Sequence, residues 1–459
     1  MPLDKYQSKV VQFNEDVLVI AGPGSGKTTT IINKVNYLLE NIEPNKILLL
    51  SFTNKSIEDI KKRLKHEIFV TTFHKLAIDI LKYNNFPYKV CDTNLLDYII
   101  DEYILTLDIK DKNQLCRYLN ILKLNKYSKE YQSLKKLIKT FIYLFKTNNH
   151  NINNLNSMIN NYQDKFLVSI ILNILQIYEE EKNSTCSLDF DDLITKATKV
   201  LKEKYNYHKF DYIIVDEFQD TSLIRLNLLK VIYENNNAII TAVGDDAQSI
   251  FHFSGCDLNI FLNFNKYFPK SQLIFLKNTY RNSQQIIDIS SSFINKNKLQ
   301  ITKNMQSNID IKKPIEFINY YNPTKAFKEL LNSLLDEEVL ILGRNNKDIE
   351  EYIDKDFVLQ DDILIYKENK FKYLTIHSAK GLESDIVIIL NVSNKTYGIP
   401  NKLEDHEILK YAYDNFDDFP YAEERRVFFV ALTRCKTKTY LMIPKNNPSI
   451  FIKEIKKLT

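Results

Sequence analysis

The clearest chemical signal in the sequence is a run of glycines that ends in a lysine and a threonine. Residues 21–28, AGPGSGKT, contain three of the eight glycines of this 459-residue chain. Without bulky side chains, successive backbone N–H groups can converge on a phosphate at the positive end of a helix. The lysine would reach the β- and γ-phosphates of a nucleotide, and the threonine hydroxyl would ligate Mg²⁺. We therefore predict a phosphate cradle; a glycine-rich turn that binds nothing is the weaker alternative.

A pair of carboxylates supplies the partner that such a cradle needs. Asp216 and Glu217 directly follow the apolar residues 212–215, a run typical of a buried strand. In α/β sheets, ligands bind at the carboxyl ends of the strands. Asp216 would hold Mg²⁺, and Glu217 would orient and deprotonate the attacking water. Alone, the pair is equally compatible with a solvated turn, but beside the cradle it indicates hydrolysis of a nucleoside triphosphate.

The elements that must position these residues alternate between strand and helix. Continuous apolar runs separated by helical stretches, such as 27–40 and 54–64, are typical of a parallel sheet covered on both faces. A second set of strands, with a closing helix at 422–433, follows in the C-terminal half. The predicted strands are 16–20, 47–52, 212–215 and 238–243 in the first set, and 339–342, 374–376, 386–390 and 440–443 in the second. The fold class is therefore α/β.

Residues 76–186 break this pattern. Apolar residues recur there at helical spacing and strand signals vanish, so we expect a helical subdomain inserted in the first α/β unit. Within it, the Asn-rich stretch 148–161 is expected to be a solvated loop. Further along, the polar stretch 295–313 is expected to be the most flexible segment of the chain.

Composition narrows the class of protein. Lysine plus arginine (62) against aspartate plus glutamate (58) gives a net charge of +4, which excludes a histone-like polycation but allows a local basic groove. Five scattered cysteines without a CxxC pair argue against a disulfide framework and a zinc module. No apolar run is long enough to span a membrane, and the N-terminus lacks the apolar core of a signal peptide. We expect a soluble cytoplasmic protein with no membrane partner.

Further short motifs resemble, in family order, those of UvrD/Rep-type superfamily 1 DNA helicases. Any one of the shorter motifs would be weak evidence, but together they extend from residue 3 to residue 435. The matching segments are 3–7 (LDKYQ), 51–55 (SFTNK), 72–74 (TFH), 188–193 (LDFDDL), 216–221 (DEFQDT), 243–250 (VGDDAQSI), 279–282 (TYRN), 339–346 (VLILGRNN), 377–383 (HSAKGLE) and 423–434 (EERRVFFVALTR). The resemblance implies two RecA-like P-loop domains with parallel sheets that bind ATP between them. It also makes the aspartates of 188–193 a structural segment, so nuclease activity is not expected.

The resemblance assigns roles around the nucleotide. Gln7 would read the adenine, Tyr280 would stack on it, and Glu383 would approach the ribose. The residues implied to be catalytic are Lys27, Glu217, Gln248, Arg281 and Arg434, with both arginines placed across the cleft on the γ-phosphate. Arginine suits this role because its planar fork stabilises charge on phosphoryl oxygens; in isolation, either arginine could be a surface ion pair. The residues implied to bind ATP are Gln7, Ala21, Gly22, Gly24, Ser25, Gly26, Lys27, Thr28, Thr29, Tyr280 and Glu383, and those implied to hold Mg²⁺ are Thr28 and Asp216.

The resemblance also implies a groove for single-stranded DNA. Aromatic faces stack bases of any sequence, and polar side chains contact the phosphates. The residues at the matching positions are Phe52, Asn54, Thr72, Phe73, His74, Phe251, Phe253, Arg344, Thr375 and His377. In a chain with 27 phenylalanines, each phenylalanine could equally belong to the core. Such a groove reads phosphates and base faces rather than sugars, so RNA is not excluded.

Two departures from the family pattern are expected to matter. His252 and Ser254 stand where the family usually has arginines, so we expect a weaker and more salt-sensitive grip on the strand beside Phe253. The interval from Arg281 to Thr375 is too short for the large extra subdomain that full-size relatives carry there. In the family that subdomain contacts duplex and regulates unwinding, so the motor would be unrestrained or would depend on a partner.

We therefore expect three domains and a motor function. The first RecA-like domain would comprise residues 1–76 and 186–270, the helical insertion 77–185, and the second RecA-like domain 271–459, with a short connection at about 351–373. The resemblance implies an ATP-dependent helicase or translocase that moves 3′ to 5′ on single-stranded DNA and acts at single/double-strand junctions, with a protein partner in a repair, replication or defence complex. The alternatives are a strand-stimulated ATPase subunit without autonomous unwinding, and a catalytically idle DNA-binding module. The intact catalytic set argues against the idle module.

Overall fold

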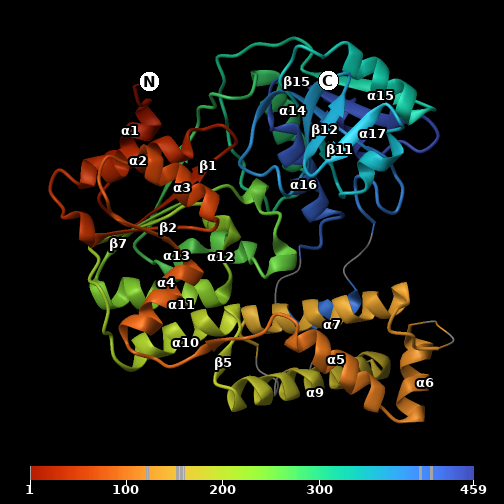
Figure 1. Ribbon diagram of the computed structural model, residues 1–459. Helices are drawn as coiled ribbons and strands as arrows, with labels where there is room; N and C mark the ends of the chain where they lie inside the picture. Colours follow the sequence, from red (N-terminus) through yellow and green to blue (C-terminus); the bar gives the residue numbers. More distant parts are fainter. Residues whose placement is uncertain are drawn as a thin grey trace.

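Two helix-covered sheets and a separate group of helices make up the chain. The computed structural model describes residues 2–119, 121, 123–150, 155, 159, 161–402, 406–413 and 417–459. Figure 1 shows the two sheet-containing parts side by side, with the helical group at the bottom, mostly below the second. This arrangement confirms the predicted α/β class with two RecA-like sheets.

The first sheet has six strands, all parallel. Its strands in spatial order are β3 (Phe69–Thr72), β2 (Ile47–Ser51), β6 (Tyr212–Val215), β7 (Ile239–Gly244), β1 (Val17–Ala21) and β8 (Gln272–Leu276). Strands β1, β2 and β6 are buried along their whole length, because helices cover both faces. One face packs on α1 (Lys5–Gln12), α2 (Lys27–Leu38) and α3 (Asn54–Arg63), and the other on α4 (Phe73–Tyr83), α10 (Phe190–Glu203), α11 (Leu223–Asn236), α12 (Leu258–Leu262) and α13 (Phe264–Tyr267).

The boundary predicted at residue 270 differs from the strand pairing. Strand β8 pairs in parallel with β1 over Gln272–Leu276, so this strand completes the first sheet rather than opening the second. The strand lies at the edge and is partly exposed, which weakens its apolar signal in the sequence. The chain therefore crosses to the second half after residue 276, immediately before the TYRN segment.

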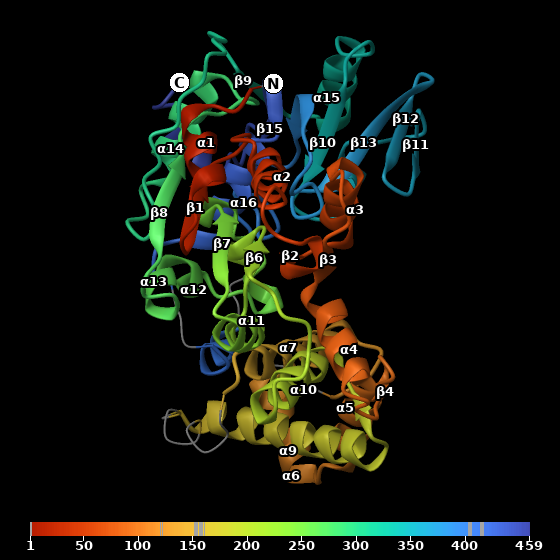
Figure 2. The ribbon, with the colours of Figure 1, turned by 90° about the vertical axis from the view of Figure 1, so that its left-hand side faces the viewer.

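In the described residues, the helical subdomain contains four helices, which project away from both sheets (Figure 2). They are α5 (Leu95–Thr106), α6 (Ile109–Tyr118), α7 (Lys129–Thr147) and α9 (Tyr162–Ser184), and they enclose a core of their own. One strand pair was not expected here: β4 (Lys89–Val90) pairs with β5 (Ser187–Leu188) at the base of the subdomain. Two-residue strands leave no periodicity to detect. The stretch 148–161, expected to be a solvated loop, lies mostly outside the described residues.

The second sheet has seven strands and mixed direction. Its strands in spatial order are β11 (Phe357–Gln360), β12 (Ile363–Tyr366), β13 (Asn369–Thr375), β10 (Val339–Gly343), β14 (Ser384–Ile389), β15 (Cys435–Pro444) and β9 (Ile315–Tyr320). The strands from β13 to β9 are parallel, whereas β11 and β12 extend the edge in antiparallel fashion. Helices α14 (Gln284–Ile294), α16 (Ala422–Leu432) and α17 (Ile450–Ile455) cover one face, and α15 (Pro323–Asn332) covers the other.

A segment of the second half reaches the helical subdomain. The 3₁₀ turn η6 (Glu407–Tyr411) buries Ile408 and Leu409 in the core of that subdomain. The Tyr411 hydroxyl donates to Asp164 Oδ2 at 3.0 Å. The subdomain is thus held by both halves of the chain. Separately, none of the helices in the described residues is long and apolar enough to cross a membrane.

Candidate functional site

The glycine-rich segment forms a tight turn between β1 and α2. Gly24 and Gly26 have φ values of 66° and 76°, which favour glycine. A Cβ atom on Gly24 would lie 2.5 Å from Arg281 Cβ, and one on Gly26 would lie 2.6 Å from Gln7 Nε2. Any side chain at these positions would therefore collide with residues from outside the turn. Ala21 ends β1 and Gly22 and Ser25 follow in the turn, while Lys27, Thr28 and Thr29 begin α2.

The two predicted carboxylates lie beside the cradle, at the end of β6. Lys27 Nζ is 3.2 Å from Glu217 Oε1, and Glu217 adopts a left-handed backbone with φ 52°, a strained conformation that is common at functional sites. Burial raises the pKa of Asp216 to about 7, and the neighbouring charge of Glu217 adds to the effect. Burial alone would raise the pKa of Glu217 as well, but Lys27 and Lys380 outweigh it and lower that pKa.

The donors of this site fit a magnesium nucleotide. Mg²⁺ prefers oxygen ligands, and Thr28 with Asp216 offers a hydroxyl and a carboxylate. The elevated pKa of Asp216 marks a buried carboxylate whose charge a cation would stabilise. The Ser25 hydroxyl is buried without a hydrogen-bond partner among the described residues, as a group that awaits a phosphate oxygen would be.

Cations from the second half reach the cradle. The Arg434 side chain is 1% exposed, and its Nη2 donates to Gln248 Oε1 at 3.2 Å. Burial and then Arg281 lower the pKa of Arg434 to about 9. Arg281 donates from Nε to Glu383 Oε2 at 2.7 Å. The predicted set Gln248, Arg281, Glu383 and Arg434 is therefore brought together at the cradle.

The adenine-side residues also lie against the turn. Gln7 Nε2 donates to the Ser25 carbonyl oxygen at 3.3 Å, and the Tyr280 N–H donates to the Gly24 carbonyl oxygen at 2.9 Å. The Tyr280 hydroxyl donates to Asp4 Oδ2 at 2.7 Å, while 48% of the residue remains exposed. Tyr280 thus keeps an accessible ring beside the cradle, as stacking would require.

Two lysines of the site, Lys380 and Lys303, were not predicted from the sequence to take part in it. Lys380 Nζ lies 2.5 Å from Asp220 Oδ2 and links the HSAKGLE segment to the DEFQDT segment; its place inside a recognised motif was an available signal. Lys303 is 9% exposed and pairs with Asp245 at 2.8 Å and with Asp246. It belongs to the stretch 295–313, whose polar composition led us to expect flexibility. That expectation is wrong for this part of the stretch, since its charge is buried against the first half.

Three of the predicted strand-contacting residues, Phe251, Phe253 and His377, cluster where the two halves meet. The His377 ring lies 6.1 Å from the Phe251 ring and 5.8 Å from the Phe253 ring, centroid to centroid. Phe253 is 54% exposed, in the turn η4 (His252–Ser254). On the first half, the Phe52 ring carries the guanidinium of Arg225 at 5.3 Å. Arg225 has no counterpart in the motifs and was missed.

Several other members of that set are engaged elsewhere. Phe73 is only 2% exposed and packs in the core of the first half, so its predicted stacking on a base is wrong for this conformation. Arg344 donates to Glu424 Oε1 at 2.7 Å instead of presenting a free charge. Thr72 and Thr375 accept hydrogen bonds from backbone N–H groups of the turns that follow them, and the exposed Asn54 begins α3.

The two histidines of the set carry no fixed charge near neutral pH. Burial lowers the pKa of His74 to about 4, with a further contribution from Arg225. Burial likewise lowers the pKa of His377 to about 4, with a further contribution from Arg344. Both rings are therefore neutral above about pH 5. They can hydrogen-bond or stack, but they cannot neutralise a phosphate.

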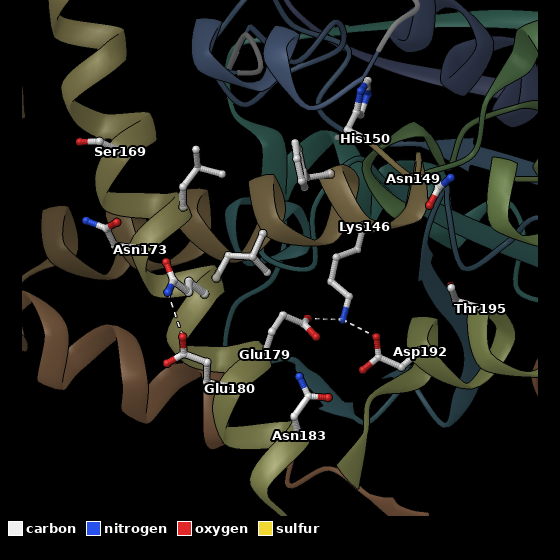
Figure 3. A pocket seen from close by; sticks show the side chains of 14 residues that line it. Lys146, Asn149, His150, Ser169, Asn173, Glu179, Glu180, Asn183, Asp192 and Thr195 are labelled. Carbon is white, nitrogen blue, oxygen red and sulfur yellow. Dashed lines mark hydrogen bonds and ion pairs between the residues drawn. The ribbon is translucent and has the colours of Figure 1, made fainter. Parts of the chain in front are cut away.

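Asp189 and Asp192 of the segment 188–193 belong to a half-buried ion cluster, whereas Asp191 accepts a hydrogen bond from the Thr147 hydroxyl instead. Lys182 Nζ lies 2.8 Å from Glu179, 3.0 Å from Asp189 and 2.5 Å from Asp192. Figure 3 shows Lys146 reaching Glu179 and Asp192 in the same cluster. The three carboxylates lie close enough together to hold a metal ion, but two ammonium groups already offset most of their charge.

The fold and this set of residues define a P-loop nucleotide-binding protein with two RecA-like halves. A family model described as the UvrD/REP helicase N-terminal domain matches residues 3–269, and one described as the UvrD-like helicase C-terminal domain matches 355–446. The first match covers more than half of the chain, so the chain belongs to the UvrD/REP helicase family, as the motifs predicted.

Several curated proteins are similar to the chain over most of its length. DNA helicase IV of Escherichia coli is 26% identical over 100% of this chain and 70% of its own length. ATP-dependent DNA helicase Rep of Buchnera aphidicola is 30% identical over 80% of this chain and 55% of its own length. ATP-dependent DNA helicase PcrA of Staphylococcus epidermidis is 28% identical over 64% of this chain and 40% of its own length. The chain thus spans only about half the length of most of these relatives.

Proposed function

We propose that the chain is an ATP-driven motor that moves along single-stranded DNA and separates duplex ahead of it. The observation that carries the proposal is the approach of Arg281 and Arg434, from the second half, to the cradle and carboxylates of the first. The relatives are named as ATP-dependent DNA helicases, which supports DNA as the track. Movement from 3′ to 5′ rests on the family resemblance alone.

Each residue around the cradle would have a separate role in ATP hydrolysis. Lys27 and the backbone N–H groups of the turn would hold the phosphates, and Gln7 with Tyr280 would hold the base. Thr28 and Asp216 would hold Mg²⁺, which neutralises charge on the phosphate oxygens. Glu217 keeps its carboxylate ionised through Lys27 and Lys380, so it is ready to accept a proton from the attacking water. Arg281 and Arg434 would stabilise the charge that develops on the γ-phosphate.

Coupling to movement would come from the same arginines. Arg434 touches the first half through Gln248, and Lys380 touches it through Asp220. A γ-phosphate bound at the cradle would add to these contacts and favour the closed cleft, and its loss would let the halves separate. The aromatic cluster of Phe251, Phe253 and His377 spans both halves, so a strand stacked there would be gripped and released in each cycle.

A second candidate, a strand-stimulated ATPase that translocates without unwinding, is favoured by one observation. The interval from β10 to β13 holds only η5 (Asp348–Glu351) and the edge strands β11 and β12, where full-size relatives carry the subdomain that contacts duplex. The partner would then be a protein that supplies the duplex contact in a repair, replication or defence complex.

ATP hydrolysis with and without oligothymidylate tests the motor. We expect strand-stimulated hydrolysis that disappears in Lys27→Ala, whereas an equal rate with and without the strand would refute the proposal. Forked duplexes with a 3′ or a 5′ single-stranded tail then separate the two candidates. Unwinding of the 3′-tailed fork alone supports a 3′ to 5′ helicase; hydrolysis without unwinding of either fork supports the translocase.

A further inference from the structure

A basic groove lies between the helical subdomain and the exposed aromatic residue of η4. Its volume is about 470 Å³, and its lining includes Lys135, Lys136, Lys139 and Tyr143 of α7 together with Phe253. Phe253 is the most exposed member of the aromatic cluster described above. The groove therefore begins where the predicted base-stacking surface ends.

One face of α7 continues that surface. Positions 136, 139 and 143 lie on the same face of a helix, and the first and last of them are about 10 Å apart along its axis. At the far end of this face, the Tyr143 hydroxyl donates to the Ser254 carbonyl oxygen at 3.1 Å. One turn further, Thr147 packs so closely that a Cβ atom on Gly255 would lie 2.4 Å from its Cγ2. The lysine face and the η4 turn are thus joined through direct contacts.

The groove carries unneutralised positive charge. Lys135 pairs with Asp101 at 2.9 Å, and Lys139 pairs with Asp97 at 2.7 Å. Lys136 is exposed, and no carboxylate in the described part of the chain lies within ion-pair distance of it. One free ammonium therefore faces the groove.

This charge lies beside predicted strand-contacting residues that lack a free positive charge of their own. His252 and Ser254 occupy positions where arginines are usual in the family, and Arg344 is held by Glu424. Arg225 supplies a cation at Phe52, and Lys380 Nζ lies 4.9 Å from the centre of the Phe251 ring. Lys135, Lys136 and Lys139 of α7 line a cavity together with Phe253.

We propose that this groove binds the phosphodiester backbone of the single strand whose bases stack on Phe253, with Lys136 as the principal phosphate contact. The inference rests on the proposed function, because it extends the strand path of that motor onto the helical subdomain. A lysine reads a phosphate as a point charge without base or sugar specificity, so the site takes DNA and RNA strands alike. The binding energy at this site is electrostatic, and it therefore falls as salt rises.

Fluorescence anisotropy with labelled oligothymidylate tests the site over a series of salt concentrations. On single strands, each phosphate contact contributes about 0.7 to the slope of log K against log salt, so Lys136→Ala should lower the slope by about that amount. At low salt we expect roughly two- to fivefold weaker binding. Lys136→Arg, which keeps the charge, should retain the wild-type slope. Lys165→Ala is the control, since Lys165 is an exposed lysine of α9 that does not line the groove.

The possible results distinguish failure of the groove proposal from failure of the proposed motor function. If the wild type binds the strand and hydrolyses ATP in response, but Lys136→Ala and Lys165→Ala both keep the wild-type slope, the groove proposal is overturned and the motor stands. If the wild type neither binds the strand nor responds to it, the proposed function fails first. Oligouridylate should lose the same increment of slope in Lys136→Ala; a loss confined to oligothymidylate would contradict a phosphate contact.

Discussion

Replacing Lys182 by methionine should destabilise the helical subdomain strongly. Lys182 is 2% exposed and contacts Glu179, Asp189 and Asp192 at 2.8, 3.0 and 2.5 Å. Burial would raise the pKa of Asp189, but Lys146 and Lys182 outweigh it and hold that pKa below its usual range. Methionine has a similar length but no charge, so the substitution isolates the electrostatic contribution from the packing.

The cluster sets the size of the effect. Three carboxylates face two ammonium groups, and after the substitution they face only Lys146. Removing one partner of a fully buried ion pair costs about 3–5 kcal/mol. The Glu179, Asp189 and Asp192 side chains are 38%, 20% and 16% exposed, so solvent screens part of their charge and we expect the lower end of that range, about 3 kcal/mol. The stabilising contribution of Asp189 is fully present above about pH 4, its ordinary unfolded value, and is lost as pH falls through its lower folded value. Lys182→Met should therefore weaken the acid dependence as well.

Urea unfolding monitored by far-ultraviolet circular dichroism measures both effects. The matched control is Lys199→Met, since Lys199 pairs with Glu203 across 3.9 Å with both side chains more than 60% exposed, and such pairs contribute about 0–1 kcal/mol. If Lys182→Met unfolds at the same urea concentration as Lys199→Met, the cluster is not a structural ion network. Metal-dependent stabilisation of the wild type would point instead to a cation site at these carboxylates.

Three further results are expected. Gln7→Ala should reduce the preference for ATP over GTP in nucleotide-binding titrations, because Gln7 is held against the cradle by the Ser25 carbonyl oxygen; an unchanged preference would exclude a role in adenine recognition. Phe253→Ala should weaken oligothymidylate binding by about 1–3 kcal/mol, whereas Phe73→Leu, in the core, should leave it within a factor of two when compared in the same assay. Gly24→Ala should impair nucleotide binding, since its Cβ would lie 2.5 Å from Arg281 Cβ; affinity equal to that of the wild type would show that the turn tolerates side chains.

The features that short sequence patterns encode, namely buried strands and the residues of the cradle, were predicted from the sequence. The apolar runs at β1, β2, β6, β7, β10, β14 and β15 were all recognised, because strands buried on both faces read as continuous apolar residues. The glycine turn and the carboxylates after β6 follow from chemistry at fixed spacing. The strands at the sheet edges, β3, β8, β9 and β11, were not recognised, and neither was β12, which lies beside β11. Partly exposed strands carry mixed residues that resemble loops.

Contacts between distant segments could not be predicted in the same way. The burial of Phe73, the pairing of Lys303 with Asp245 and the docking of η6 on the helical subdomain all depend on tertiary packing. The polar composition around Lys303 indicated flexibility because composition reports solubility and not partners. Arg225 lies outside the motifs, and only its position over Phe52 marks it.

The most direct test of the motor is single-turnover ATP hydrolysis by Arg434→Lys at saturating oligothymidylate. Arg434 is buried and meets the first half at Gln248, 3.2 Å away, and a lysine cannot reproduce its planar fork. An arginine that stabilises the transferred phosphoryl group is worth about 10³–10⁵ in rate. We expect hydrolysis to fall by about a thousandfold while ATP affinity stays within a few-fold. A hydrolysis rate close to that of the wild type would contradict the claim that the second half completes the active site.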